Sequence, residues 1–179
     1  VSNDGWAVSL INSAYWGFGA HILEPHTGII FQNRGTSFSL DPTSPNAFAP
    51  GKRPRHTLMP VMVLRGDELI LVPATMGGSA QPQIHAQLFL RQLDGATPIE
   101  ATHAPRWIVN EVGADGVRSA SVEEDVPQST KKALEAAGFA LKVLPKYSEK
   151  LGHSNVIRVE LNGYSAASDP RSDGSAIVI

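Results

Sequence analysis

One long and two short segments of the chain carry hydrophobic residues at helical spacing. From about Gln81 to Leu93 the period is close to 3.6, so that Ile84 and Leu88 share one face of the predicted helix. Pro82 fits its first turn, because the first N–H groups of a helix have no partner within it. Shorter helices are predicted over Pro98–His103 and over about Val126–Ala137, the latter with a capping box of Asp125 and Gln128.

Hydrophobic runs bounded by turn residues predict strands elsewhere. Met59–Leu64 and Leu69–Ala74 flank Arg65-Gly66-Asp67, which indicates a hairpin. Because the strands outnumber the helices and form local hairpins, the sequence predicts an α+β fold with antiparallel sheet, in a single domain over residues 1–179. The other predicted strands are Trp6–Ile11, Gly28–Asn33, Phe139–Leu144, Ser154–Leu161, Tyr164–Ala167 and Ala176–Ile179.

The chain opens with a strong signal for a tight turn. Asn3, Asp4 and Gly5 all tolerate the positive φ that hairpin turns require. A strand follows this turn, whereas only Val1 and Ser2 precede it. We therefore expect the chain to begin inside a hairpin, with residues missing upstream. A frayed start before a first strand is the alternative.

Composition and charge argue against several classes of protein. The net charge of −2 gives no reason to expect a nucleic acid or an anionic membrane as a partner. No apolar run could span a bilayer and no targeting segment is visible, so a cytoplasmic and a periplasmic location both stay open. The absence of cysteine excludes disulfides and thiolate nucleophiles. The histidines show no metal-ligand spacing with carboxylates, so neither a metal nor another cofactor is expected.

Short motifs follow one another in a specific order along the chain. Each is weak alone, since a lone Gly-Gly-Ser is mostly a flexible turn, but their joint order and spacing are highly specific. They are Gly28-Ile-Ile-Phe-Gln-Asn33, Pro45-Asn46-Ala47, Pro50-Gly51-Lys52-Arg53-Pro54, Met76-Gly77-Gly78-Ser79, Glu100-Ala-Thr-His-Ala-Pro105-Arg106, Gly152-His153 and Ala167-Ser168-Asp169-Pro170-Arg171. This succession resembles the small subunit of the gamma-glutamyltranspeptidase family over essentially the whole chain. The Asn33-Arg34-Gly35 and Arg55-His56-Thr57 segments look closest to its cephalosporin acylase-like and glutathione hydrolase-like branch.

The resemblance implies the four-layer αββα fold of N-terminal-nucleophile hydrolases, with this chain as the small-subunit portion. In that family a precursor cuts itself before a threonine, whose hydroxyl attacks an amide while its own free amine acts as general base. The implied partner is the large N-terminal subunit of the same precursor. The implied substrate is a small gamma-glutamyl or related acyl amide, as in glutathione metabolism. No threonine of this chain fits the role of nucleophile, because the matching position lies upstream of Val1.

Three residues receive catalytic roles from the resemblance. Gly77 and Gly78 match the oxyanion-hole glycines, whose N–H groups stabilise the charge that develops on the attacked carbonyl oxygen. A simple helix-entry turn is the alternative for this pair. Ser13 falls where a threonine supports the nucleophile, and it keeps the hydroxyl. Its alternative is a loop serine bonded to local backbone.

The residues expected to bind substrate depart from the family's pattern. Ser37 stands where an acidic residue usually holds the substrate's α-ammonium, and Arg34 lies just upstream, where a neutral side chain is usual. Tyr15 replaces an asparagine, and His56-Thr57 replaces a pair of serines that bind the substrate's carboxylate. Each residue alone would be an ordinary loop or surface residue. Because the changes fall at one site, they indicate altered specificity.

Three functions stay open on the sequence. The first is a gamma-glutamyltransferase-like or hydrolase-like amidohydrolase that works through an acyl-enzyme, with this chain inactive alone. A cephalosporin (glutaryl) acylase-like amidase differs from it only in substrate. A non-catalytic binding protein that keeps the fold is the third, and the absent threonine favours it. A threonine one strand-length upstream of Asn3 would favour the enzyme.

Overall fold

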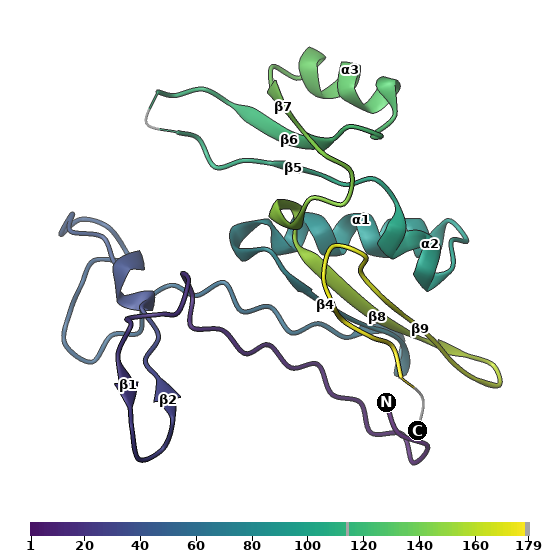
Figure 1. The fold of residues 1–179 in the computed structure, drawn as a ribbon, viewed down its shortest axis with the longest axis horizontal. Helices are drawn as coiled ribbons and strands as arrows, with labels where there is room; N and C mark the ends of the chain where they lie inside the picture. Colours follow the sequence, from purple (N-terminus) through teal and green to yellow (C-terminus); the bar gives the residue numbers. More distant parts are fainter. Residues whose placement is uncertain (114, 178–179) are drawn as a thin grey trace. The chain divides into compact units, whose positions relative to one another are not determined.

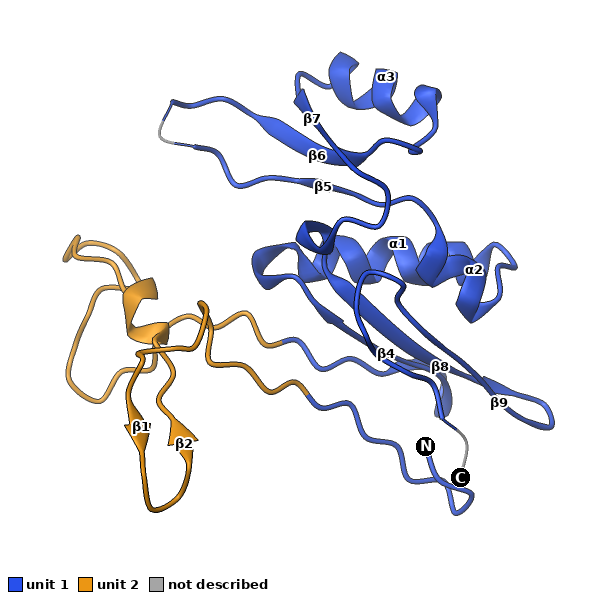
Figure 2. Ribbon diagram, in the orientation of Figure 1, with its two compact units in different colours: residues 1–10, 59–179 blue, residues 11–58 orange. Residues whose placement is uncertain are grey.

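The computed structural model describes residues 1–113 and 115–177. The chain forms two compact units, the larger made of Val1–Leu10 with Met59–Ile179 and the smaller of Ile11–Leu58 (Figure 2). Helices and strands are both present, so the predicted α+β class is confirmed. A single domain over residues 1–179 stays a prediction. No helix within the described ranges is both long enough and apolar enough to cross a bilayer.

A four-stranded antiparallel sheet forms the centre of the larger unit. Its order is β3-β4-β8-β9, from Val63–Arg65, Glu68–Met76, His153–Glu160 and Gly163–Ser168 (Figure 1). The hairpin predicted at Arg65-Gly66-Asp67 joins β3 to β4. Helices α1 (Gln81–Leu93) and α2 (Pro98–His103) pack on this sheet. The shared core consists of Leu71, Leu88, Ala101, Val156 and Ala167.

The helix bounds predicted from the sequence agree with the structure for two of the three predicted helices. Helices α1 and α2 have the bounds that the sequence predicted. Thr97 and Glu100 form a capping box at the start of α2, where each side chain receives the other residue's backbone N–H. The capping box predicted for the third helix is wrong. Helix α3 (Gln128–Ala136) begins after Pro127 without a side-chain cap.

A second, three-stranded sheet was only partly foreseen. It contains β5 (Trp107–Val109), β6 (Ser119–Glu123) and β7 (Ala140–Leu144), of which only β7 was predicted. Strand β6 pairs antiparallel with β5 but parallel with β7, which departs from the all-antiparallel expectation. Helix α3 lies between β6 and β7 in the chain, and Leu134 packs with Ala120 and Val122 of β6. A helical crossover is the usual way to join parallel neighbours.

Two glutamine side chains of α1 bind the outer edge of β5. The amide of Gln83 donates to the Val109 carbonyl at 3.0 Å and accepts from the Val109 N–H at 2.7 Å. One turn later, Gln87 donates to the Trp107 carbonyl at 2.6 Å and accepts from the Trp107 N–H at 3.5 Å. Residues four apart on a helix lie on one face, which matches alternate residues of a strand. The two amides thereby take the place of a neighbouring strand and cover an open sheet edge.

Four buried charges lie where the two sheets meet. Arg106 donates to Asp169 at 2.7 Å, and Arg171 binds Asp169 at 3.0 Å. The Arg171 Nε donates to the Glu123 carboxylate at 2.7 Å, and Glu123 also receives the Arg106 backbone N–H at 2.9 Å. The two arginines and two carboxylates balance, so the cluster is neutral. All four side chains are less than one-tenth exposed.

Backbone groups complete the hydrogen bonds of this cluster. Arg106 donates to the carbonyls of Leu151 and Gly152, and Arg171 donates to those of Thr102 and Ala104. Burial by itself would raise the pKa of Asp169, but the charge of Arg106 and the hydrogen bonds to both arginines lower it below its ordinary value. Asp169 is therefore held ionised, and the cluster ties α2, β5, β6 and β8 to the segment after β9.

Three further strands were predicted near the two ends of the chain and in the smaller unit, and little of them is formed. Strands β1 (Leu23–Glu24) and β2 (Ile29–Ile30) make a short hairpin in the smaller unit, so only part of the strand predicted at 28–33 is formed. Residues 6–11 form no strand with any described segment, so the predicted strand is wrong there. The turn before it is confirmed, since the Ser2 N–H binds the Trp6 carbonyl at 2.8 Å. No strand forms at 176–177, and 178–179 lie outside the described residues.

Asp169→Asn should lower the free energy of unfolding by about 3–5 kcal/mol, because it leaves a buried guanidinium without its ion-pair partner. Urea unfolding of the intact protein, followed by circular dichroism, measures the change. Glu160→Gln is the control, because the Arg158–Glu160 pair is partly exposed and its loss should change stability little. The stabilisation from the lowered pKa of Asp169 is fully present above the unfolded-state value of about 3.9 and is lost progressively as the pH falls from there through the lower folded-state pKa. The difference between wild type and Asp169→Asn should therefore shrink below about pH 4.

Candidate functional site

Gly77 and Gly78 form the turn between β4 and α1. A Cβ atom at Gly77 would lie 2.6 Å from Cδ1 of Ile84, so the end of the Ile84 side chain would have to move, and the φ of +156° is a conformation that L residues rarely adopt. Gly78 has a φ of +55°, a left-handed conformation that glycine adopts at little cost, although its Cβ position is open. Both glycines thus have backbone angles that disfavour larger residues, and Gly77 is in addition crowded by the Ile84 side chain.

The turn leaves backbone N–H groups available at the start of a helix. Gly78–Ala80 forms a short 3₁₀ helix that continues directly into α1. The first N–H groups of a helix have no acceptor within it, and the helix dipole favours negative charge at this end. The geometry is therefore suited to bind an oxyanion. The catalytic role of Gly77 and Gly78 itself stays a prediction.

Arg34 is the most unusual charged residue of the smaller unit. It lies at the start of the 3₁₀ helix Arg34–Ser37 and is only 6% exposed. Its Nη1 is 3.4 Å from the Thr57 hydroxyl, whereas its buried Nη2 has no hydrogen-bond partner among the described residues. None of the ion pairs in the described part of the chain includes Arg34. A buried guanidinium without a carboxylate is costly unless a ligand supplies one.

Tyr15 lies against the guanidinium of Arg34. The Arg34 Cζ is 5.0 Å from the centroid of the Tyr15 ring, within the range of a cation–π contact. Tyr15 has a φ of +85°, which is rare for a bulky residue and costs energy. The Ser13 hydroxyl accepts the Tyr15 N–H at 3.0 Å and so supports this conformation. This contact matches the local-backbone alternative for Ser13, and its expected support of a nucleophile stays a prediction.

Ser37 joins two segments of the smaller unit. Its hydroxyl lies 2.8 Å from the Arg34 carbonyl and 2.9 Å from the Arg55 carbonyl. These contacts hold the turn that contains Arg34 against the segment that contains His56 and Thr57. An aspartate at position 37 would place a carboxylate against two carbonyl oxygens. The structure thus brings together Tyr15, Arg34, Ser37 and Thr57, while His56 is exposed.

Asn33 is a positioning residue that the sequence analysis did not single out. Its side chain accepts the Trp16 N–H at 3.0 Å and donates to the carbonyls of Trp16 and Gly19, at 3.1 and 2.9 Å. It therefore fixes the backbone next to Tyr15 from the position next to Arg34. The signal that could have identified it is its place at the end of the Gly28–Asn33 motif, because asparagine side chains often bind loop backbone.

Comparisons with known proteins find related sequences over the whole chain. A model of the family described as gamma-glutamyltranspeptidase matches residues 1–179. The oxamate amidohydrolase proenzyme of Klebsiella pneumoniae is 40% identical over 178 residues, 98% of this chain and 34% of that protein. The chain thus spans about a third of the length of this curated relative.

Solved structures show the same fold. The gamma-glutamyltranspeptidase from Pseudomonas nitroreducens complexed with L-DON superposes with a TM-score of 0.84 at 26% identity, covering 100% of this chain and 96% of that one. The cephalosporin acylase from Bacillus halodurans gives a TM-score of 0.80 at 35% identity, covering 91% of this chain and 30% of that one. The N-terminal-nucleophile hydrolase fold that the resemblance implied is confirmed.

Gly78→Val should lower kcat by about 10² in the intact enzyme, because it disturbs an expected oxyanion donor. The fold should persist, since a Cβ at this position meets no atom within 4 Å. Gly66→Val is the matched control, because Gly66 has a φ of +62° and an equally open Cβ position in the β3–β4 turn. Both variants should lose similar stability, and only Gly78→Val should lose activity. An unchanged kcat would remove Gly78 from the mechanism.

Proposed function

The chain belongs to the gamma-glutamyltranspeptidase family, and we propose that it is the smaller chain of a self-processed amidohydrolase that acts through an acyl-enzyme. The match of the family model to residues 1–179 supports the proposal, as does the fold shared with solved gamma-glutamyltranspeptidases. The name of the oxamate amidohydrolase relative includes the word proenzyme, which supports production as a longer precursor.

The proposed nucleophile is a threonine upstream of Val1, outside the sequence given. Its hydroxyl attacks the amide carbon while its α-amine takes the proton, which is reasonable since an α-amine titrates near neutrality. The carbonyl oxygen becomes an oxyanion that the N–H groups of Gly77 and Gly78 stabilise. The C–N bond then breaks, the amine leaves with the proton, and water or an acceptor amine releases the acyl group.

The proposed substrate is an acyl amide that carries a carboxylate but no ammonium near it. The buried Arg34 guanidinium with a free Nη2 is the observation on which this depends. A carboxylate can bind a guanidinium through two parallel hydrogen bonds, and the Tyr15 ring would hold the guanidinium in place. Oxamate is itself a carboxylate-bearing amide without an ammonium, and the name of a relative at 40% identity supports this class.

Gamma-glutamyl donors are the second candidate, supported by the family itself. Their acyl group carries an α-ammonium, which favours a nearby carboxylate. Ser37 offers no charge and its hydroxyl already lies against two carbonyls, while Arg34 would repel the ammonium. Glutaryl amides avoid this penalty, and the similarity to the cephalosporin acylase is consistent with such an acyl group. We therefore place carboxylate-only acyl groups first.

The intact enzyme should hydrolyse oxalyl and glutaryl anilides with a higher kcat/KM than gamma-glutamyl anilide. A charge-assisted contact is worth about 1.5–3 kcal/mol, which corresponds to roughly a tenfold to hundredfold preference. Arg34→Met should remove the preference, because it keeps an unbranched apolar stem but deletes the charge. Release of aniline, followed by its absorbance, gives both constants.

Arg53→Met serves as the matched control for this test. Arg53 is an exposed arginine of the same unit, so its loss should leave the preference unchanged. A wild type that strongly prefers gamma-glutamyl anilide would contradict the assigned substrate class. A purified two-chain protein that hydrolyses none of these anilides would favour the non-catalytic binding protein.

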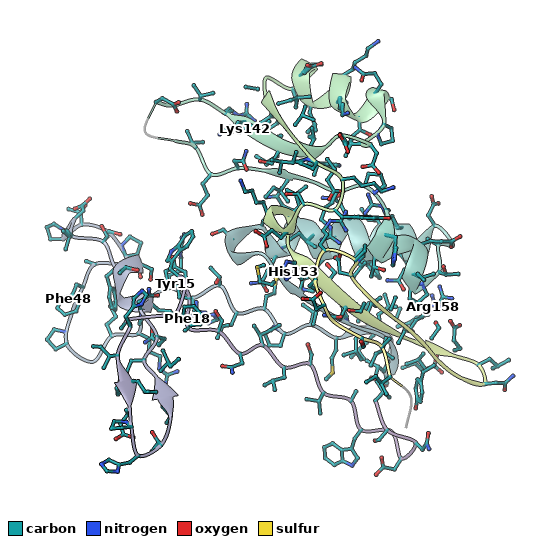
Figure 3. All side chains as sticks on the ribbon, in the orientation of Figure 1. Tyr15, Phe18, Phe48, Lys142, His153 and Arg158 are labelled. Atoms are coloured by element: carbon teal, nitrogen blue, oxygen red, sulfur yellow. The ribbon has the colours of Figure 1, made fainter. Side chains whose placement is uncertain are left out.

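A large partner subunit is also proposed. The chain spans about a third of the length of its curated relatives, and the smaller unit exposes many large apolar side chains, including Phe18 and Phe48 (Figure 3). Apolar surface of this kind in a small unit usually marks an interface. The exposed residues are Trp16, Phe18, Ile22, Leu23, Ile29, Ile30, Phe31, Leu40 and Phe48.

The 179-residue chain produced alone should be inactive and should aggregate. The same chain produced within its precursor should elute as one species in size-exclusion chromatography with light scattering. The physical reason is the exposed apolar surface, which only the partner would cover. A monodisperse, active isolated chain would contradict both the partner and the missing nucleophile.

A further inference from the structure

Two buried hydroxyls form a chain of hydrogen bonds just before the glycine turn. Thr75 of β4 and Ser154 of β8 are directly opposite in the sheet and are 3% and 0% exposed. The Ser154 hydroxyl donates to the Thr75 hydroxyl at 3.1 Å, and the Thr75 hydroxyl donates to the Met76 carbonyl at 2.8 Å. Both hydrogen bonds can form at the same time, because each hydroxyl donates its single proton and the Thr75 oxygen accepts the proton of Ser154.

The Met76 carbonyl belongs to the same peptide group as the Gly77 N–H. A trans peptide is planar, so its carbonyl and its N–H point in opposite directions. A hydrogen bond that fixes the Met76 carbonyl therefore also fixes the direction of the Gly77 N–H. We infer that Thr75 is a positioning residue for this oxyanion donor, an inference that depends on the proposed function.

The backbone of Gly152 also packs closely against the Met76 carbonyl and restrains it. A Cβ atom at Gly152 would lie 2.3 Å from the Met76 oxygen, so only glycine allows this close approach. Its φ of +82° also favours glycine. The Gly152 carbonyl in turn accepts from Arg106 at 2.9 Å. The Met76 carbonyl is thus held between a hydroxyl and a backbone segment that is itself fixed.

The buried ion cluster anchors both restraints. Arg106 holds Gly152, and Asp169 accepts the backbone N–H of Ser154 at 2.8 Å through the oxygen that also binds Arg106. The hydroxyl chain therefore ends on a rigid, neutral core. His153, which is labelled in Figure 3, precedes Ser154 as the first residue of β8, and it pairs with Met76 of β4. Oxyanion stabilisation requires donors that are oriented before the reaction, which this arrangement would supply.

Thr75→Val in the intact two-chain enzyme tests the inference, because valine keeps the shape and deletes the hydroxyl. We expect kcat to fall roughly tenfold, a part of the 10²–10³ loss that follows removal of a donor, with KM changed less than about twofold. Thr75→Ser should restore most of kcat, since it restores the hydroxyl. Glutaryl and oxalyl anilides are the substrates.

Thr102→Val is the matched control for a purely structural effect. Thr102 is also fully buried, and its hydroxyl bonds the Pro98 and Ile99 carbonyls within α2. Both valine variants should lose similar thermal stability, and Thr102→Val should keep the wild-type kcat. An unchanged kcat in Thr75→Val, or an equal loss of kcat in both variants, would overturn the positioning role.

Hydrogen exchange of the segment 75–80, measured by mass spectrometry, gives a readout independent of activity. Thr75→Val should speed exchange there and Thr102→Val should not, because only the first frees the Met76–Gly77 peptide. A wild type that hydrolyses none of the anilides would refute the proposed function, and the exchange rates alone would then decide the inference. Equal exchange in both variants would refute it.

Discussion

The neutral cluster of Arg106, Asp169, Glu123 and Arg171 is the constraint on which the larger unit depends. Buried charges cost several kcal/mol each unless they are paired and fully hydrogen-bonded, so the cluster is viable only when all four groups are in place. Its members come from the connection between α2 and β5, from β6 and from the segment after β9, and its backbone partners add the turn before β8. Forming the cluster therefore requires the two sheets and their connections to assemble together.

The candidate oxyanion turn takes its rigidity from this cluster. Arg106 holds Gly152, whose backbone packs on the Met76 carbonyl, and Asp169 holds Ser154, whose hydroxyl reaches Thr75. Helix α1, which starts at the turn, is bound in addition to β5 by Gln83 and Gln87. The glycines are thus set between a strand and a helix that are each fixed independently. Such preorganisation lets N–H donors act without reorganising during a reaction.

Arg34 is a buried arginine whose environment differs from that of the arginines in the ion cluster. Arg106 and Arg171 are buried with carboxylates and are structural, whereas Arg34 is equally buried with a phenol ring, a hydroxyl and a free Nη2. The cost of the unpaired charge falls on the smaller unit, which also holds Tyr15 in a strained conformation. A ligand carboxylate would remove this cost, which is the physical basis of the carboxylate-bearing acyl group proposed as substrate.

The sequence by itself determined the family, the α+β class and the bounds of α1 and α2, because motif order, helical periodicity and proline positions are local signals. It also predicts that Arg34 and Ser37 depart from the family's pattern. It did not reveal β5 and β6, which are short and have little periodicity, nor the parallel pairing of β6 with β7. Only the tertiary structure decided that Arg34 is buried with no carboxylate partner among the described residues, that Ser37 bonds two carbonyls and that Thr75 reaches Met76. Those facts depend on which distant segments of the chain pack together. The burial and the hydrogen-bond partners of a residue are set by this packing and cannot be read from the residue alone.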